Sequence, residues 1–281
     1  MGTNLTEPFV GSYEYTTVYR YTDEVLLNDD ELRVVPLEDA HTIRGRYEVM
    51  TTPASSQVEF EDDFGNTVIR ARVTSPHREL EVVSKGSFKL LPWSNTYADI
   101  PLDRLEFPEH TSTFASPSPM VKPALLQEKA GEIAGSSKTL IALVGSVINW
   151  VHDNIMYERG VTSVNTDAKQ VLDQGRGVCQ DKVHLTLGLL RALSIPCRYV
   201  SCILTRQDGD THAYAEFFHP QAGWLPADPT KGLLIDVGTS YLKLAVGRDY
   251  TEASPIKGSF LSKGSGNLSK VYAHVEPDKA Y

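Results

Sequence analysis

Apolar and polar residues alternate with a period of two through much of the first 90 positions. Residues 68–73, Val-Ile-Arg-Ala-Arg-Val, show this most clearly, because the two arginines fall on the face opposite Ile69 and Ala71. Turn residues such as Asn-Asp-Asp at 28–30 and Phe-Gly-Asn at 64–66 separate the alternating runs. The pattern predicts short strands at 13–21, 31–36, 42–50, 57–61, 67–73 and 79–83. Strands at such intervals predict an antiparallel β-sandwich over residues 1–107.

The spacing of apolar residues changes after a proline-rich stretch. Prolines at 108, 117, 119 and 123 are mixed with serine and threonine, so we expect residues 108–123 to be a linker without a regular helix. Leu140, Val144, Val147 and Val151 then recur at helical spacing, with Ser136 and Ser137 before them as expected caps. A second domain is predicted over residues 124–281.

Two further helices and several strands are predicted in this second domain. Thr166 and Asp167 are expected to start a short helix that Gly175 ends, and the next helix begins at Cys179. β-rich runs follow at residues 199–204, 212–218, 224–227 and 269–275. The predicted fold class is therefore α+β, with a helix packed on an antiparallel sheet.

Composition and charge exclude several function classes. The chain has 281 residues and a formal net charge of -9, without a basic stripe, so we expect no nucleic-acid partner and no anionic membrane. Three cysteines are too few for a disulfide framework and suit a reducing compartment, and no apolar run is long enough to span a membrane, so a cytoplasmic location is predicted. Paired metal ligands such as Cys-x-x-Cys do not occur, and we expect no metal and no cofactor.

Cys179 lies where a glycine-punctuated turn, Gly-Arg-Gly-Val-Cys-Gln-Asp at 175–181, enters a helix. The unpaired N–H groups and the dipole at a helix start favour thiolate over thiol, which makes a cysteine nucleophilic. Val183, Leu187 and Leu190 share the face of Cys179, so we expect the thiol at the buried edge of the helix. Cys197 and Cys202 lie in apolar surroundings and are predicted to be core residues.

Two residues downstream are suited to assist a thiol. His212 opens the run His-Ala-Tyr-Ala-Glu-Phe-Phe, and Asp228 follows in Trp-Leu-Pro-Ala-Asp-Pro-Thr at 224–230, where a neighbouring strand is expected to end. In thiol chemistry the cysteine attacks a carbonyl, the imidazole carries the proton, and the carboxylate fixes the imidazole. His184 is the rival base, but it lies on another side of the helix from Cys179.

These motifs, in this order, resemble the core of the bacterial and archaeal transglutaminase-like family. Segments before the core resemble the amino-terminal β domain of the same family, among them Asp-Phe-Gly-Asn-Thr at 63–67 and Pro-His-Arg-Glu-Leu at 76–80. The resemblance implies a papain-like core with Cys179 as nucleophile, His212 as base and Asp228 as its orienting partner. The chain departs from the family in having Tyr214 in place of a tryptophan and Lys182 in place of a phenylalanine, which predicts a more polar cleft wall.

The resemblance implies a candidate cysteine protease or acyltransferase, in which Cys179 forms a thioester with a peptide or protein amide. The acyl group then passes to water or to an amine, and we expect water. The alternative is a non-catalytic module that binds a peptide or protein. The backbone N–H of Cys179 is one expected oxyanion donor, and Asn154 or Tyr157 is the second. Sequence leaves the natural substrate, the role of the amino-terminal domain and the oligomeric state open.

Overall fold

A computed structural model describes residues 7–93 and 97–278 of the protein. The strands of the amino-terminal part are β1 (Phe9–Leu32), β2 (Thr42–Thr52), β3 (Ser56–Glu61), β4 (Thr67–Val73) and β5 (His77–Leu90). Three short 3₁₀ helices follow, at Leu102–Arg104, Glu109–Ala115 and Pro123–Leu126. The helices are α1 (Gln127–Ala134), α2 (Leu140–Asn154), α3 (Ala168–Gln174), α4 (Cys179–Ala192) and α5 (Tyr250–Ala253). The remaining strands are β6 (Met156–Tyr157), β7 (Arg176–Gly177), β8 (Cys197–Leu204), β9 (His212–His219), β10 (Gly223–Asp228), β11 (Leu233–Leu234), β12 (Tyr241–Gly247), β13 (Ile256–Ser262) and β14 (Gly266–Pro277).

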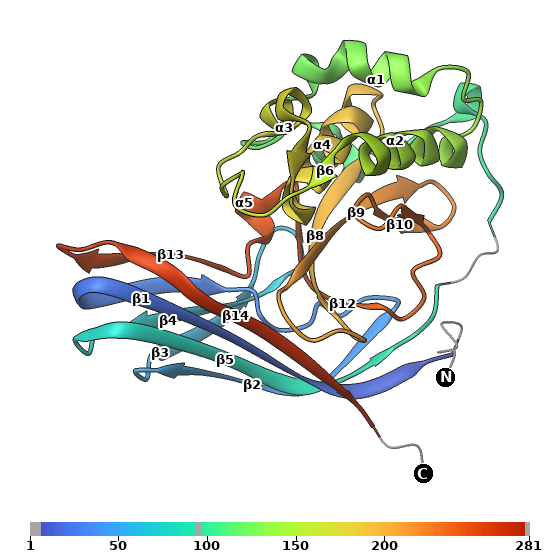
Figure 1. Ribbon diagram of the computed structural model, residues 1–281. Helices are drawn as coiled ribbons and strands as arrows, with labels where there is room; N and C mark the ends of the chain where they lie inside the picture. The colour runs from blue at the N-terminus through green and yellow to red at the C-terminus, as the bar shows by residue number, and fades with distance from the viewer. Residues whose placement is uncertain (1–6, 94–96, 279–281) are drawn as a thin grey trace.

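The elements form three layers, as Figure 1 shows. Helices α1 to α4 cover one face of a five-stranded sheet with the order β11-β10-β9-β8-β12, and a long seven-stranded sheet lies on the other side. Helix α4 packs against β8 and β9 with an almost continuously buried surface. The opposite face contributes Ile203, Leu242 and Leu244 to the core of the seven-stranded sheet. The five-stranded sheet is thus buried on both faces, which fixes the positions of its strand ends.

The seven-stranded sheet is antiparallel and is built around the long strand β1. The first half of β1 pairs with β5 and β14, and its second half pairs with β4 and β13. Side chains from both halves share one core, which includes Tyr13, Tyr15, Val25 and Leu32. The predicted α+β class, with an antiparallel amino-terminal β region and a helix packed on an antiparallel sheet, is confirmed. The strands expected to form a sandwich over residues 1–107 instead belong to one sheet, which packs on the five-stranded sheet.

Residues 28–30, predicted as a turn, lie inside β1, and this prediction is wrong. Asn28 donates to the hydroxyl of Tyr21 at 3.0 Å and contacts a ring nitrogen of His77 at 2.7 Å. Asp29 pairs with arginines on the adjacent strand β4 at 2.7 and 2.8 Å. These cross-strand partners satisfy side chains that would otherwise favour a turn. The strand predicted at 13–21 and the first residues of the one predicted at 31–36 therefore belong to a single strand, which ends at Leu32.

The last two strands, β13 and β14, do not pair with strands of the predicted second domain. β13 and β14 follow residue 124, yet they pair with β1 as part of the amino-terminal sheet. Strand pairing between distant segments leaves no local mark in a sequence, and this sheet takes strands from both predicted domains. The division into 1–107, a linker at 108–123 and 124–281 stays a prediction. Within the linker range the chain forms the 3₁₀ helix Glu109–Ala115.

Helix α2 is not capped as predicted. Its N-cap residue is Thr139, which makes no capping hydrogen bond, and Ser137 instead contacts the hydroxyl of Ser146. The backbone N–H of Ile141 donates to Asp99 at 2.9 Å, so the cap comes from a distant part of the chain. Helix α3 follows the prediction, with Asp167 in a capping box and Gly175 in the left-handed conformation at its end.

Candidate active site

The turn before α4 is held by a carboxylate that points back over the helix start. Asp181 accepts hydrogen bonds from the backbone N–H of Val178 and from the hydroxyl of Thr162, both at 2.7 Å. Gly177 makes room for this arrangement, because a Cβ there would lie 2.6 Å from the Cβ of Asp181. Burial raises the pKa of Asp181. These contacts of Asp181 therefore hold the turn that leads into Cys179, the first residue of α4.

His212 and Asp228 meet at the ends of adjacent strands. His212 is the first residue of β9 and Asp228 the last of β10, and the two strands are antiparallel neighbours. Nε2 of His212 lies 2.8 Å from Oδ2 of Asp228. The imidazole is 9% exposed and the carboxylate is completely buried, so little water competes for this bond.

Asp228 is surrounded by donors. Its Oδ2 also accepts from the hydroxyl of Tyr241 at 2.6 Å, and Oδ1 accepts from the backbone N–H groups of Thr230 and Lys231. Burial alone would raise the pKa of Asp228, but the hydrogen bond and charge of His212, together with Tyr241 and the backbone donors, lower it. The carboxylate is therefore ionised at neutral pH and cannot rotate freely.

The same contacts set the protonation of His212. Burial lowers its pKa, but the hydrogen bond to Asp228 and the interaction with Cys179 outweigh burial and raise the pKa to about 9. With Nε2 engaged by Asp228, Nδ1 is the nitrogen left for the thiol. At neutral pH the imidazole is positively charged next to the sulfur, and such a charge stabilises a thiolate.

The structure brings together all three residues predicted from the sequence. Cys179 is partly exposed, whereas Cys197 and Cys202 are completely buried. Burial raises the pKa of Cys197 to about 11, and burial likewise raises that of Cys202 well above its usual value. Only Cys179 combines solvent access with an imidazole, among these three thiols.

His184 does not serve the thiol. Its Nε2 accepts the backbone N–H of Tyr250 at 3.2 Å, and its ring packs 5.4 Å from that of Tyr199. Complete burial lowers its pKa to about 4, so the imidazole is neutral. The histidine nearest Cys179 in sequence is a core residue.

The two side chains proposed as a second oxyanion donor lie in different settings. The amide of Asn154 donates to the carbonyl oxygen of Trp150, one turn back in α2, at 2.9 Å. Tyr157 is 46% exposed and lies on β6, beside the strand β7 that precedes α4. The backbone N–H of Cys179 belongs to the first turn of α4 and has no acceptor within the helix. Tyr157 and the backbone N–H of Cys179 therefore remain candidates for oxyanion donors. The amide of Asn154 is already used in the hydrogen bond to Trp150.

A more polar cleft wall is not found where the sequence suggested it. Tyr214 is 2% exposed, and its hydroxyl donates to Glu216 at 3.4 Å. Lys182 is 3% exposed, and its ammonium donates to the carbonyl oxygen of His152 at 3.2 Å. Both polar groups point into the protein, so neither offers much surface to a substrate.

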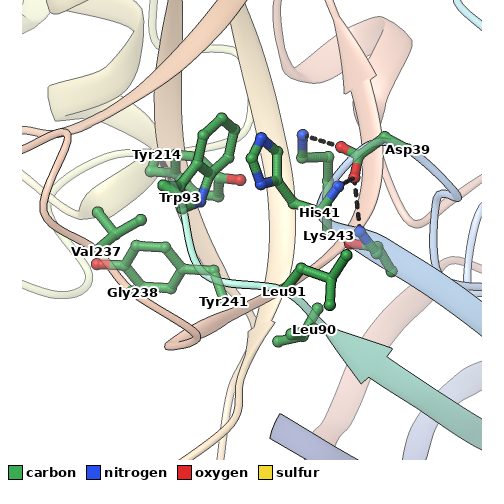
Figure 2. Close-up of a pocket in the computed structure, with 11 residues that line it drawn as sticks. Asp39, His41, Leu90, Leu91, Trp93, Tyr214, Val237, Gly238, Tyr241 and Lys243 are labelled. Carbon is green, nitrogen blue, oxygen red and sulfur yellow. Dashed lines mark hydrogen bonds and ion pairs between the residues drawn. The ribbon is translucent and has the colours of Figure 1, made fainter. Parts of the chain in front are cut away.

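Figure 2 shows the residues around Tyr241 where the amino-terminal part of the chain packs on the five-stranded sheet. Tyr214 stacks on Tyr241 at a ring-centroid distance of 4.8 Å, and His41 stacks on Trp93. The cavity between these residues has a volume of about 10 Å³, space for one water at most. The amino-terminal part of the chain thus packs tightly against the residue that holds Asp228.

Sequence reasoning missed the residues that hold the three side chains in place. Asp181 had a local signal, since an acidic residue at the third helical position is a common cap partner, although Val178 does not fit the usual pattern. Tyr241 had no such signal, because its contact with Asp228 depends on the pairing of β12 in the sheet.

No cluster of metal-ligating residues occurs in residues 7–93 and 97–278, and no helix there is long and apolar enough to cross a membrane. The cytoplasmic location and the absence of a nucleic-acid or membrane partner stay predictions.

Comparison with known proteins covers both parts of the chain. A model of the transglutaminase-like superfamily matches residues 127–229, and one of the bacterial transglutaminase-like N-terminal region matches residues 12–88. An uncharacterized protein of Mycobacterium leprae is 28% identical over 92% of this chain and 95% of its own length. One of Mycobacterium bovis is 25% identical over 98% of this chain and 96% of its own. A crystal structure of a candidate cysteine protease from Cytophaga hutchinsonii matches with a TM-score of 0.82 and 20% identity, covering 98% of this chain and 92% of that one.

Proposed function

Because the chain belongs to the transglutaminase-like family, in its core and in its amino-terminal region, we propose that it is a thiol enzyme acting on amides of peptides or proteins. The observation that carries the proposal is the buried imidazole of His212, which interacts with Asp228 on one side and Cys179 on the other and has a pKa of about 9. In this proposal Cys179 is the nucleophile, His212 the acid and base, and Asp228 the residue that orients His212.

The first half of the reaction makes a thioester. The sulfur of Cys179 attacks the carbonyl carbon, and the N–H groups at the start of α4 stabilise the oxyanion that forms. The C–N bond then breaks as His212 gives its proton to the leaving nitrogen. The acyl group remains on sulfur, and the imidazole is neutral.

The second half releases the acyl group. Water or a primary amine attacks the thioester carbonyl while His212 takes the proton from the attacking atom. The C–S bond breaks, which restores the thiolate and the charged imidazole. Asp228 stays ionised throughout, because its oxygens accept from Tyr241 and from two backbone N–H groups as well as from His212.

Water is the acceptor that we propose, which makes the reaction a hydrolysis. Transfer to an amine requires water to be excluded from the thioester. Cys179 is partly exposed, and the side chain of Tyr157 on the strand beside its turn is 46% exposed. An open thiol of this kind favours the most abundant nucleophile.

A mass-spectrometric assay tests the proposal. The protein is incubated with a peptide library, with and without a primary amine, and the products are compared with those of Cys179→Ala. We expect chain cleavage or amide loss by the wild type, little amine incorporation, and no product from the variant. Products that persist in Cys179→Ala would contradict the proposal. Binding of library peptides without any turnover would instead support the interaction module.

A further inference from the structure

A cavity of about 590 Å³ lies between the seven-stranded sheet and the helical core. Its walls include Tyr19, Tyr21 and Asp30 of β1, Tyr250 of α5, and Phe260 of β13. Val164, from the loop before α3, also lines it. Figure 1 shows α5, which carries Tyr250, between the helical core and β13. None of Cys179, His212 and Asp228 lines it, so it is separate from the candidate active site.

Asp30 places a carboxylate in this cavity. The residue is 7% exposed, and its neighbours on the adjacent strands are Gly258 of β13 and Ala71 of β4. A Cβ at position 258 would lie only 1.9 Å from Oδ1 of Asp30. The carboxylate therefore occupies the space that a side chain at 258 would fill, and glycine is required there.

Among the described residues, no cation of the protein balances the charge of Asp30. No lysine or arginine nitrogen lies within 4.0 Å of its oxygens in the described residues. Arg70 and Arg72 form ion pairs with the neighbouring Asp29 instead. The ammonium of Lys257, which also lines the cavity, donates to a backbone carbonyl oxygen, that of Thr251, at 3.2 Å.

The pKa of Asp30 reflects this setting. Burial and the charge of Asp29 raise it, a hydrogen bond from Asn28 lowers it, and the result is about 6. The group is thus mostly ionised at neutral pH while it is deprived of water. A buried carboxylate in this state favours the approach of a positive charge.

The rest of the cavity is aromatic. The rings of Tyr21 and Phe260 lie 4.9 Å apart, and the ring of Tyr21 covers Gly266 so closely that a Cβ there would lie 2.9 Å from it. Tyr19 and Tyr250 add further rings. Aromatic faces attract cations, and together with a carboxylate they form a typical site for an organic ammonium group. The volume is in the range of small-molecule sites.

We propose that this cavity binds a primary ammonium group carried on an apolar chain, either a free amine or the side chain of a lysine residue, with Asp30 as its counter-ion. The aromatic walls take the apolar chain, and neutral analogues bind more weakly. The bound amine keeps its proton and is not a nucleophile, so this site does not supply the acyl acceptor. The inference does not depend on the proposed thiol chemistry.

Calorimetric titration tests the site with two matched pairs of probes. The first pair is 2-phenylethylamine and the neutral 2-phenylethanol, and the second is Nα-acetyl-lysine amide and Nα-acetyl-norleucine amide. The protein carries Cys179→Ala, which removes turnover and leaves the cavity unchanged. The comparison of the two amines distinguishes a free amine from a lysine residue, whereas each neutral partner measures the contribution of the charge.

We expect at least one of the two amines to bind with one-to-one stoichiometry, and about tenfold or more tightly than its neutral partner. Asp30→Asn, which keeps the shape of the side chain, should abolish this preference. Asp29→Asn, on the outward face of the same strand, is the matched control and should leave it intact. The proposal is overturned if neither amine binds, if the neutral partners bind equally well, or if Asp29→Asn removes the preference as Asp30→Asn does.

Discussion

Strand β9 carries two buried polar centres that differ in their partners. His212, at its start, pairs with Asp228, whereas Glu216, four residues later, pairs with Arg198 and Lys243, each at 2.6 Å. Burial opposes ionisation of Glu216, but these two cations lower its pKa. Lys243 is shared with Asp39 of the amino-terminal part at 2.7 Å, the contact visible in Figure 2.

One of these centres on β9 has a structural part and the other a chemical one. Arginine and lysine keep their charge at any ordinary pH, so the centre at Glu216 has one protonation state and joins the two parts of the chain. The centre at His212 contains an imidazole, which can give and take a proton during the reaction, and it is partly open to solvent through Cys179. Changes at the first centre should reduce stability, and changes at the second should reduce turnover.

The largest expected effect is on turnover, from His212→Gln. Glutamine can still donate to Asp228 but carries no proton in the reaction, so turnover of the peptide substrates should fall about 10³-fold. The matched control is His219→Gln at the other end of β9, where the ring contacts the carbonyl oxygen of Ala98. Equal losses in the two variants, measured by initial rates per folded molecule, would contradict the assignment.

The next effect is on stability, from Glu216→Ala. This change leaves Arg198 without its partner in a buried setting, and the free energy of unfolding should fall by about 3 kcal/mol. Glu79→Ala, which breaks an exposed ion pair with Arg20, is the comparison and should have little effect. Urea denaturation measures both. A loss for Glu216→Ala no greater than that for Glu79→Ala would remove the distinction between the two centres.

A smaller effect is expected from Tyr241→Phe. The change removes one donor from Asp228 and leaves the ring in place, so turnover should fall about tenfold. Tyr214→Phe is the control, since its hydroxyl contacts Glu216 and not Asp228. If Tyr214→Phe lowers turnover as much as Tyr241→Phe does, the hydroxyl of Tyr241 has no special part in holding Asp228.

The smallest effect is a change with pH. His212 has a raised pKa, so its protonated form persists above the usual range and is lost as the pH rises through about 9. Turnover should fall to half its maximum near that pH, and the stability contributed by the bond to Asp228 should be lost over the same range. A turnover profile that declines already near pH 6.5, the ordinary pKa of histidine, would contradict the contacts described for His212.

Local chemistry explains which parts of the fold were predictable. Asp167 and Gly175 mark the two ends of α3, and the glycine turn before Cys179 marks the start of α4, because caps and turns act within a few residues. Cys179, His212 and Asp228 were found because each residue type stands at a predicted element end. Their functional roles stay predictions until turnover is measured.

Contacts between distant segments explain what was not predictable. Asp99 caps α2 from 42 residues away, and the two ends of the chain share one sheet through β14 and β1. Tyr241 reaches Asp228 only because β12 pairs with β8 at the edge of the central sheet. None of these contacts follows from the spacing of residues, since each depends on which strands become neighbours.

The most direct test of the central claim, that His212 activates Cys179, is the rate at which iodoacetamide labels each cysteine. Mass spectrometry of proteolytic peptides gives the three rates in one experiment, for the wild type and for His212→Gln. We predict that Cys179 is labelled first, that Cys197 and Cys202 are protected in the folded protein, and that His212→Gln slows labelling of Cys179. Faster labelling of a buried cysteine, or an unchanged rate for Cys179 in the variant, would contradict the account.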